Sequence, residues 1–215
     1  AESLGLDLDV ELPDGSTTPL RGLPLWALTN IRTEASLDLW HALWSSASPE
    51  DVKAALADHS LATVGYQDYH RRLSGFFGDP LPPSVVLVAA TAHYWWEKIV
   101  RALGIGSNQL RFVAVDHRYR MDPDALWDRL VALTDRRQPV MACVSVCGTT
   151  DESSIDALDR VLAVRERAEQ ELGITFHVHS DAAYGGYVAS VTRRADGTRR
   201  SAEDIRASTG IDWPS

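Results

Sequence analysis

The chain has 215 residues and a mass of 23.7 kDa, which suits one compact domain or a piece of a larger one. Apolar residues make up 45% and charged residues 24% of it, and this composition excludes a disordered chain. The net charge of −9 argues against a protein that binds nucleic acid by neutralising phosphates. The longest apolar stretch, Val85–Ala92, falls far short of the ~20 residues of a membrane span. We therefore expect neither a nucleic-acid partner nor a membrane partner.

The first third of the chain predicts two helices. Residues 1–30 show only turn signals, whereas an apolar stripe predicts a helix over 33–44. The side chains that share one face of that helix are Leu37, Trp40, Leu43 and Trp44. A serine cap followed by proline predicts a second, short helix over 49–57.

From residue 84 onwards, short apolar runs alternate with amphipathic stretches. Strands are predicted over 85–89, 110–115, 140–146 and 175–178. Helices are predicted over 93–103, 122–134 and 155–172. This alternation predicts an α/β fold with a mostly parallel sheet and helices on both faces. A hairpin over 188–200 and a helix that begins at Ser201 are expected to follow.

The two cysteines, Cys143 and Cys147, lie in or next to a predicted strand. A strand would separate them by ~13 Å, whereas a disulfide needs Cα atoms within ~7 Å. We expect reduced thiols, which are typical of a cytoplasmic protein.

Three polar segments follow three of the predicted strands, and they span residues 91–98, 148–150 and 179–186. Because the carboxyl ends of parallel strands meet at one edge, we expect these segments to converge on a ligand site. An aspartate such as Asp181 needs a partner there, and a protonated ring nitrogen is a suitable one. A flat aromatic ring could then lie between a stacking imidazole, His93, and the small Ala183.

The same segments resemble motifs of the pyridoxal-phosphate-dependent amino-acid decarboxylases of the aromatic/glutamate decarboxylase group. Residues 115–122 and the arginine-bearing insertion after Tyr187 resemble bacterial tyrosine decarboxylase-like proteins in particular. They read His-Tyr-Trp-Trp-Glu-Lys over 93–98, Gly-Thr-Thr over 148–150 and His-Ser-Asp-Ala-Ala-Tyr-Gly-Gly over 179–186. The resemblance implies that residues 1–215 form a single, partial large domain of the fold-type-I (aspartate-aminotransferase-like) pyridoxal enzymes, which binds pyridoxal 5'-phosphate.

Individual roles follow from the resemblance. Asp181 would bind the pyridine N–H of the cofactor and keep it protonated. His93 would stack on the ring and act as a catalytic residue by positioning the substrate carboxylate or assisting proton transfer, while Ala183 would close the opposite face. Thr150, with Thr149, would hydrogen-bond near the phenolic oxygen of the cofactor or the substrate.

The phosphate loop of the family matches residues 31–36. Thr33 keeps the hydroxyl of that loop, but Ile31 and Arg32 replace its two glycines. The guanidinium of Arg32 would pair with the phosphate in place of the close backbone approach that glycines allow.

The chain has two lysines, Lys53 and Lys98, and neither matches the Schiff-base lysine of the family. That lysine follows the aspartate by several tens of residues in the family, and the present chain ends at Ser215. We therefore expect a chain truncated before this lysine, either a fragment or one half of a split enzyme.

The function that the resemblance implies is decarboxylation of an L-amino acid to an amine and CO₂ in a cytoplasmic homodimer. An aromatic substrate such as tyrosine is favoured, and an acidic one comes second. Another fold-type-I pyridoxal enzyme, such as an aminotransferase or lyase, is one alternative. A non-catalytic or split subunit without the Schiff-base lysine is the other.

Four other side chains in or next to the motifs have no assigned role. His177 and His179 are spaced like a pair of zinc ligands, but no third ligand accompanies them, so we expect packing and no metal. Trp95 and Trp96 are expected to border the substrate pocket.

Overall fold

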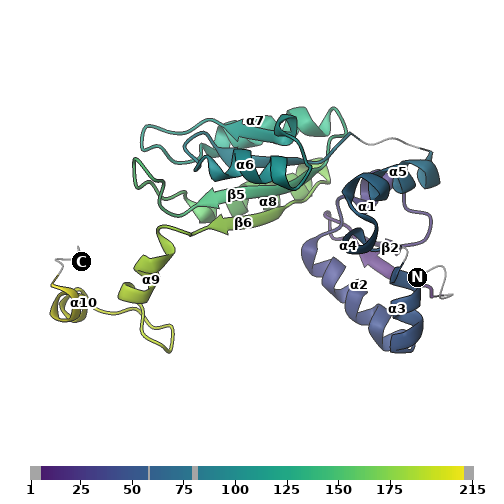
Figure 1. The fold of residues 1–215 in the computed structure, drawn as a ribbon, viewed down its shortest axis with the longest axis horizontal. Helices are drawn as coiled ribbons and strands as arrows, with labels where there is room; N and C mark the ends of the chain where they lie inside the picture. The colour runs from purple at the N-terminus through teal and green to yellow at the C-terminus, as the bar shows by residue number, and fades with distance from the viewer. Residues whose placement is uncertain (1–5, 58, 79–81, 211–215) are drawn as a thin grey trace.

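The computed structural model describes residues 6–57, 59–78 and 82–210. Three parts follow one another along the chain (Figure 1). They are an N-terminal segment (6–78), a sheet body (82–181) and a C-terminal arm (182–210) that extends away from the sheet. Within the described residues, none of the helices has the length and apolarity needed to cross a membrane.

The sheet body is built on four parallel strands in the order β4-β3-β5-β6. Their bounds are β3 (Val85–Ala89), β4 (Leu110–Val113), β5 (Val140–Val146) and β6 (His177–Asp181). The α/β prediction is therefore confirmed. The fourth strand, however, was placed wrongly over 175–178: Thr175 and Phe176 are buried ahead of the strand, and pairing with β5 begins only at His177.

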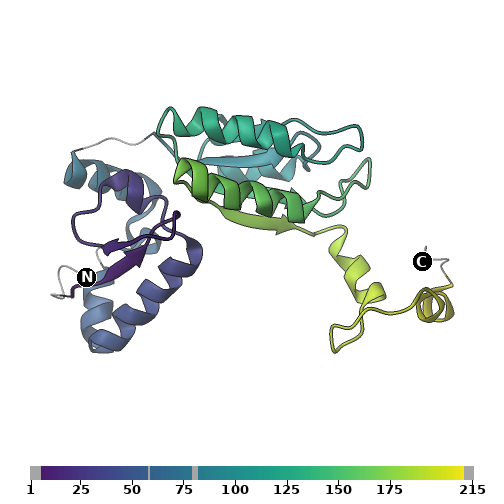
Figure 2. The same cartoon turned by 180° about the vertical axis from the view of Figure 1, so that it is seen from behind.

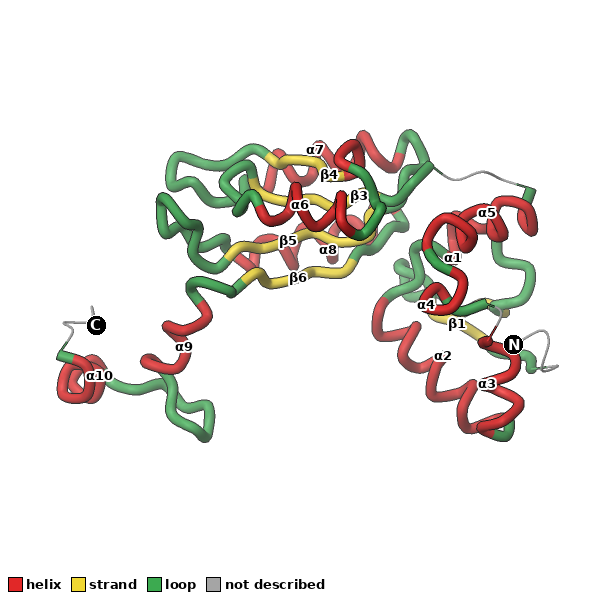
Figure 3. The backbone as a smooth tube through the Cα atoms, viewed as in Figure 1, coloured by secondary structure: helices red, strands yellow, loops and turns green. Residues whose placement is uncertain are grey.

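Helices cover both faces of this sheet, as Figures 2 and 3 show. They are α6 (Trp95–Ala102) on one face, and α7 (Pro123–Thr134) and α8 (Leu158–Leu172) on the other; a 3-10 turn, η2 (Ser107–Gln109), follows α6. Alternate residues of β3 face two separate cores, because successive side chains of a strand point to opposite faces. Leu87 packs in the core with Leu126 of α7 and Val161 of α8, whereas Val88 packs with Val100 of α6.

Helix α8 begins at Leu158 and not at Ile155, so the predicted start was wrong. Ile155 is 55% exposed and forms an isolated antiparallel bridge with Cys147. The next residue, Asp156, explains the delay, since its carboxylate binds backbone N–H groups outside the helix.

Over residues 6–57 and 59–78, the N-terminal segment contains a β-hairpin and five helices. They are β1 (Asp9–Glu11), β2 (Thr17–Pro19), α1 (Leu25–Leu28), α2 (Thr33–Ser46), α3 (Pro49–Ala57), α4 (Leu61–Val64) and α5 (Tyr66–Phe77). The two predicted helices are confirmed as α2 and α3. Leu37 and Trp40 of the predicted apolar face of α2 remain 55% and 47% exposed.

Polar contacts fasten the N-terminal segment to the sheet body. The Arg32 guanidinium lies 3.1 Å from Glu11 and 3.7 Å from the buried Glu169 of α8. Next to this pair, the backbone N–H of Thr175 donates to the Asn30 side chain at 3.4 Å, and the Thr175 hydroxyl donates to Glu169 at 2.6 Å. Glu169 of α8 thus links the residue before α2 to the segment that precedes β6.

The C-terminal arm consists of two short helices, α9 (Gly186–Thr192) and α10 (Ala202–Thr209). The predicted hairpin over 188–200 is wrong for residues 188–192, which belong to α9. The rest is confirmed: Arg193 and Arg199 form an antiparallel bridge around the predicted turn at Asp196-Gly197, and the Arg200 N–H donates to the Thr192 carbonyl at 2.8 Å. The predicted helix start at Ser201 is confirmed by a capping box with Asp204.

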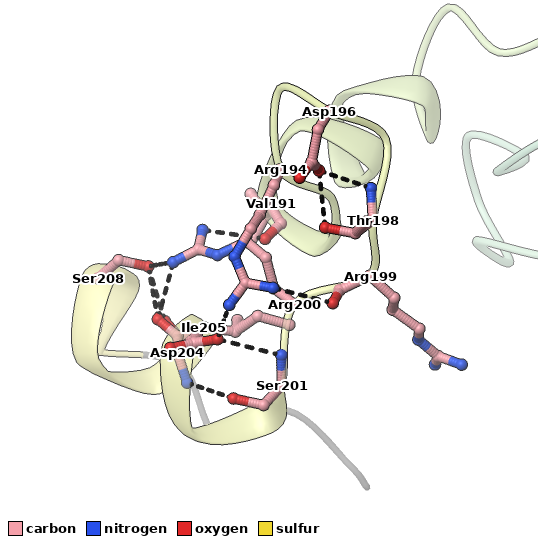
Figure 4. Close-up of polar contacts among 10 residues, drawn as sticks. All are labelled: Val191, Arg194, Asp196, Thr198, Arg199, Arg200, Ser201, Asp204, Ile205 and Ser208. Atoms are coloured by element: carbon pink, nitrogen blue, oxygen red, sulfur yellow. Dashed lines mark hydrogen bonds and ion pairs between the residues drawn. The ribbon is translucent and has the colours of Figure 1, made fainter.

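One arginine joins the two helices of the arm (Figure 4). Arg200 donates to the Val191 carbonyl at 3.1 Å, to the Asp204 carbonyl at 2.8 Å and to the Ser208 hydroxyl at 2.5 Å. Beside this network Ile205 is only 1% exposed. The arm is therefore stabilised by the hydrogen bonds of Arg200 and by the buried side chain of Ile205.

Candidate functional site

The three polar segments meet at the carboxyl edge of the sheet around an open cavity of about 730 Å³. The residues that line it are His93, Trp95, Trp96, Ile99, Leu103, Val146, Gly148, Thr149, Thr150, His179, Asp181, Ala183 and Tyr184. Five predicted site residues are among them: His93, Thr149, Thr150, Asp181 and Ala183. Strand topology alone accounts for this, because three parallel strands deliver their following loops to one edge.

Asp181 is the last residue of β6 and pairs in register with Val146 of β5. Its Oδ2 accepts a hydrogen bond from the Trp96 indole Nε1 at 2.9 Å, and its Oδ1 accepts one from the Ala183 backbone N–H at 3.3 Å. Because each carboxylate oxygen has two lone pairs, this half-buried group can accept a further N–H from a ligand.

His93 precedes the first turn of α6 and is held there by the backbone. Its Nδ1 accepts a hydrogen bond from the Trp95 N–H at 3.1 Å. An accepting nitrogen carries no proton, so neutral His93 is assigned as the tautomer protonated at Nε2. The imidazole also lies against the Tyr94 ring, with centroids 4.1 Å apart.

The two threonines of the second segment differ in their surroundings. Thr149 is buried, and its hydroxyl accepts a hydrogen bond from the Ser154 backbone N–H at 3.0 Å. Thr150 is exposed and lines the cavity. Thr149 therefore holds the turn together, and Thr150 presents its side chain to the cavity.

The second and third segments touch through a glycine. Gly185 donates its backbone N–H to the Cys147 carbonyl at 2.8 Å. A Cβ on Gly185 would overlap with that carbonyl oxygen, because the two atoms would be much closer than van der Waals contact allows. It would also lie 3.0 Å from the Cys147 Sγ. Only glycine allows the chain after β6 to pass so close to the end of β5.

We predict that Gly185→Ala lowers the free energy of unfolding by about 1–3 kcal/mol, because the added methyl group must push the two segments apart. Urea unfolding followed by circular dichroism measures this change. Gly75→Ala in α5 is the matched control: nothing lies within 4 Å of its Cβ position, so helix propensity makes that change neutral or stabilising. Equal effects of the two substitutions would contradict the close approach.

Side chains and backbone groups also tie the loops around the cavity to one another. The Thr91 hydroxyl donates to the Tyr119 carbonyl at 3.1 Å, and the Ser154 hydroxyl donates to the Arg118 carbonyl at 2.9 Å. The buried Asp156 carboxylate accepts from the Met121 N–H at 2.6 Å and the Val146 N–H at 2.7 Å, and burial raises its pKa. The loop after β4 is thereby fixed to both neighbouring loops.

Asp116 shapes this loop after β4. Its carboxylate accepts from the backbone N–H groups of Arg118 at 2.7 Å and Arg120 at 3.0 Å, and from the Arg120 guanidinium at 2.7 Å. Hydrogen bonds from Arg120 lower the pKa of Asp116 from 3.8 to about 2. The charged form of Asp116 is therefore the one that holds the loop.

This lowered pKa has a consequence for acid stability. The contribution of Asp116 is present above its unfolded pKa of 3.8 and is lost as the pH falls towards about 2. We predict a decline in the unfolding temperature across this window and a shallower decline in Asp116→Asn. Thermal unfolding between these pH values measures both slopes, and identical slopes would contradict the prediction.

Arg32 and Thr33, the predicted phosphate-binding residues, do not line the cavity. Thr33 begins α2 and borders two smaller hollows, both of which include His177. Arg32 is paired with Glu11 and Glu169, as described above. A phosphate role for Arg32 and Thr33 stays a prediction.

The two histidines of β6 were expected to pack, and this is confirmed for His179, which contacts the Trp96 ring, although both side chains are exposed. His179 lines the cavity and meets the Trp96 ring edge-on, with centroids 5.6 Å apart. Over the ranges that the structure describes, no group of three or more potential ligands is placed to hold a metal.

Trp95 and Trp96 line the cavity, where they were expected. The contacts of Trp96 with Asp181 and His179 were missed. The one sequence signal for these contacts is that Trp96 comes three residues after His93. At the start of a helix, this spacing places both residues on one side, so Trp96 faces the same cavity as His93.

Comparison with known proteins extends over most of the chain. Residues 78–208 match the model of the pyridoxal-dependent decarboxylase conserved domain. L-tyrosine decarboxylase of Enterococcus faecalis is 38% identical over 181 residues, which are 84% of this chain and 26% of that protein. L-tyrosine decarboxylase of Enterococcus faecium is 32% identical over 172 residues, 80% of this chain and 25% of that protein.

Cysteine sulfinic acid decarboxylase of Mus musculus is 37% identical over 125 residues, which cover 56% of this chain and 24% of that protein. The crystal structure of mouse CSAD aligns with a TM-score of 0.46 and 27% identity, and it covers 76% of this chain and 33% of that one. The chain thus spans about a quarter of the length of the curated relatives it matches. On the family match over residues 78–208, the chain belongs to the pyridoxal-dependent decarboxylase family.

Proposed function

We propose that the protein containing this chain decarboxylates an L-amino acid to an amine and CO₂ with pyridoxal 5'-phosphate as cofactor. The observation that carries the proposal is that, in a member of this family, Asp181 and Ala183 at the end of β6 line one cavity with His93, which follows β3. The parallel sheet body supports the same conclusion, since it is part of a fold-type-I pyridoxal-enzyme domain.

The residues that line the cavity suit the ring of this cofactor, which supplies an electron-accepting group when bound. Asp181 has lone pairs free to accept the pyridine N–H and hold a proton there. Ala183 offers a small side chain, and His93 a flat one held by the backbone. The Nε2 of His93 is the nitrogen left to donate a proton or to bind the substrate carboxylate, and the exposed Thr150 lines the same cavity.

An aromatic substrate such as tyrosine is favoured over an acidic one. Trp95 and Tyr184 line the cavity and are 51% and 64% exposed, so aromatic surface is available to a substrate ring. The matches to the two tyrosine decarboxylases also extend over more of the chain than the match to cysteine sulfinic acid decarboxylase does.

The test uses the full-length protein. Pyridoxal phosphate should give an absorbance near the visible edge that borohydride abolishes, and mass analysis should find an amine one CO₂ lighter than the amino acid supplied. A keto acid would indicate an aminotransferase instead. A well-folded protein without the absorbance would contradict the enzyme proposal and favour a non-catalytic subunit.

We further propose a cytoplasmic homodimer in which residues 1–215 belong to one partial large domain. Both cysteines are free thiols, which suits the cytoplasm. Leu37 and Trp40 leave apolar surface exposed on α2, and a second subunit would cover it. Sedimentation equilibrium of the full-length protein tests the dimer, and a monomer at micromolar concentration would contradict it.

A further inference from the structure

Trp96 lies in the first turn of α6 and reaches across the sheet edge to the end of β6. Its indole Nε1 donates to the Asp181 Oδ2 at 2.9 Å, across 85 positions of sequence. The ring packs on the core formed by β3, β4, β5 and α6, and it meets the His179 ring edge-on at an interplanar angle of 71°. These contacts hold the indole in place and fix the direction of its single N–H.

The Asp181 carboxylate has little else to fix its orientation. Its other hydrogen bond, from the Ala183 N–H to Oδ1, is long at 3.3 Å. Rotation of a carboxylate about its last side-chain bond is intrinsically loose. The shorter bond from Trp96 is thus the contact that selects which lone pairs face the cavity.

The same helical turn also holds His93. The Trp95 backbone N–H donates to the His93 Nδ1, and the Trp96 backbone N–H donates to the His93 carbonyl at 3.1 Å. The start of α6 consequently fixes two cavity residues from separate loops, one through its backbone and the other through an indole.

From this geometry we propose that Trp96 is a positioning residue: its indole N–H orients the Asp181 carboxylate so that a free lone pair receives the pyridine N–H of the cofactor. The inference rests on the proposed function, because it presumes that the cavity takes pyridoxal phosphate. Trp96 acts through Asp181 and needs no contact with the reacting atoms.

The test compares two ligands in the full-length protein. One is pyridoxal 5'-phosphate, and the other is its 1-deaza analogue, in which a C–H replaces the pyridine nitrogen and offers no N–H to Asp181. Trp96→Phe keeps an aromatic ring but removes the donor. Trp127→Phe on α7 is the matched control, since that ring stacks on Arg167 at 3.6 Å, on the opposite face of the sheet.

We expect Trp96→Phe to raise the Kd of pyridoxal phosphate about tenfold and to leave the Kd of the deaza analogue unchanged. Trp127→Phe should change neither. The analogue reports on the shape of the cavity, so the comparison stays decisive even where the substitution lowers overall stability.

Three results would overturn the inference. Equal weakening of both ligands would mean that Trp96 only supports the cavity, and unchanged binding of both would mean that its N–H is irrelevant. Tighter binding of pyridoxal phosphate to Trp96→Phe would mean that the indole competes with the cofactor for the carboxylate. If the wild-type protein binds neither ligand, the proposed function itself fails, which is a distinct outcome.

Discussion

Asp181→Asn is expected to lower kcat/KM of the full-length protein by about a hundredfold to a thousandfold, the loss typical of an electrostatic group at a reacting centre. Asparagine has nearly the same shape as aspartate and still offers an oxygen to the Trp96 indole. It carries no charge, however, so it cannot hold the pyridine nitrogen in its protonated form. Steady-state rates of amine formation, together with the Kd of pyridoxal phosphate, measure the effect.

Asp128→Asn is the control for this substitution. Asp128 is exposed on α7, on the face of the sheet opposite α6, and the same chemical change there should leave the rate as in the wild type. A variant at Asp181 with wild-type kcat/KM would exclude this carboxylate from the reaction. It would also remove the main support for the proposal that the cofactor binds in this cavity.

The largest loss of stability is expected from Asp156→Ala. The carboxylate of Asp156 is 6% exposed and accepts two backbone N–H groups, from Met121 and Val146. Alanine leaves both donors buried without an acceptor, and each such group costs ~1–3 kcal/mol. We therefore expect the free energy of unfolding to fall by ~2–5 kcal/mol, as measured by urea unfolding at neutral pH.

A control substitution at a nearby aspartate distinguishes the effect of losing these hydrogen bonds from the effect of losing a negative charge. Asp159 is exposed in the first turn of α8, so Asp159→Ala should cost at most ~1 kcal/mol through the helix dipole. Asp156→Asn should fall between the two, because its amide retains one acceptor and turns a donor towards the second N–H. If Asp156→Ala were as stable as Asp159→Ala, the two hydrogen bonds would contribute nothing to the fold.

Much of the sheet body could be predicted from local patterns. The apolar run of β3 is long enough to indicate burial on both faces, and Leu126 and Leu130 of α7 are buried at their predicted helical spacing. The strands of the hairpin could not be predicted, since β1 and β2 have three residues each, too few for an alternating pattern to be recognised. Helix α9 was missed for a similar reason: Tyr187 is 79% exposed, so no apolar stripe distinguishes the helix from a strand.

At the site, the sequence predicted which segments converge but not how their side chains bond. The convergence follows from strand order, which alternation of strands and helices already implies. The bond between Trp96 and Asp181 depends on where the first turn of α6 lies relative to the end of β6, and no local sequence pattern encodes that position. Likewise, Arg32 was expected to meet a phosphate, but docking of α2 on α8 gives it the buried carboxylate of Glu169 as a partner.

The bonds that fasten the loops to one another bear on the thermodynamics of ligand capture. Thr91 with Tyr119, Ser154 with Arg118, and Gly185 with the end of β5 are joined by hydrogen bonds within the chain itself. The conformational entropy of ordering these segments is therefore lost when the chain folds. Ligand binding does not have to order them again, so this entropy does not lower the affinity. Calorimetry should accordingly record a small entropic penalty for binding, and substitutions in the loop after β4 should weaken affinity without touching the ligand.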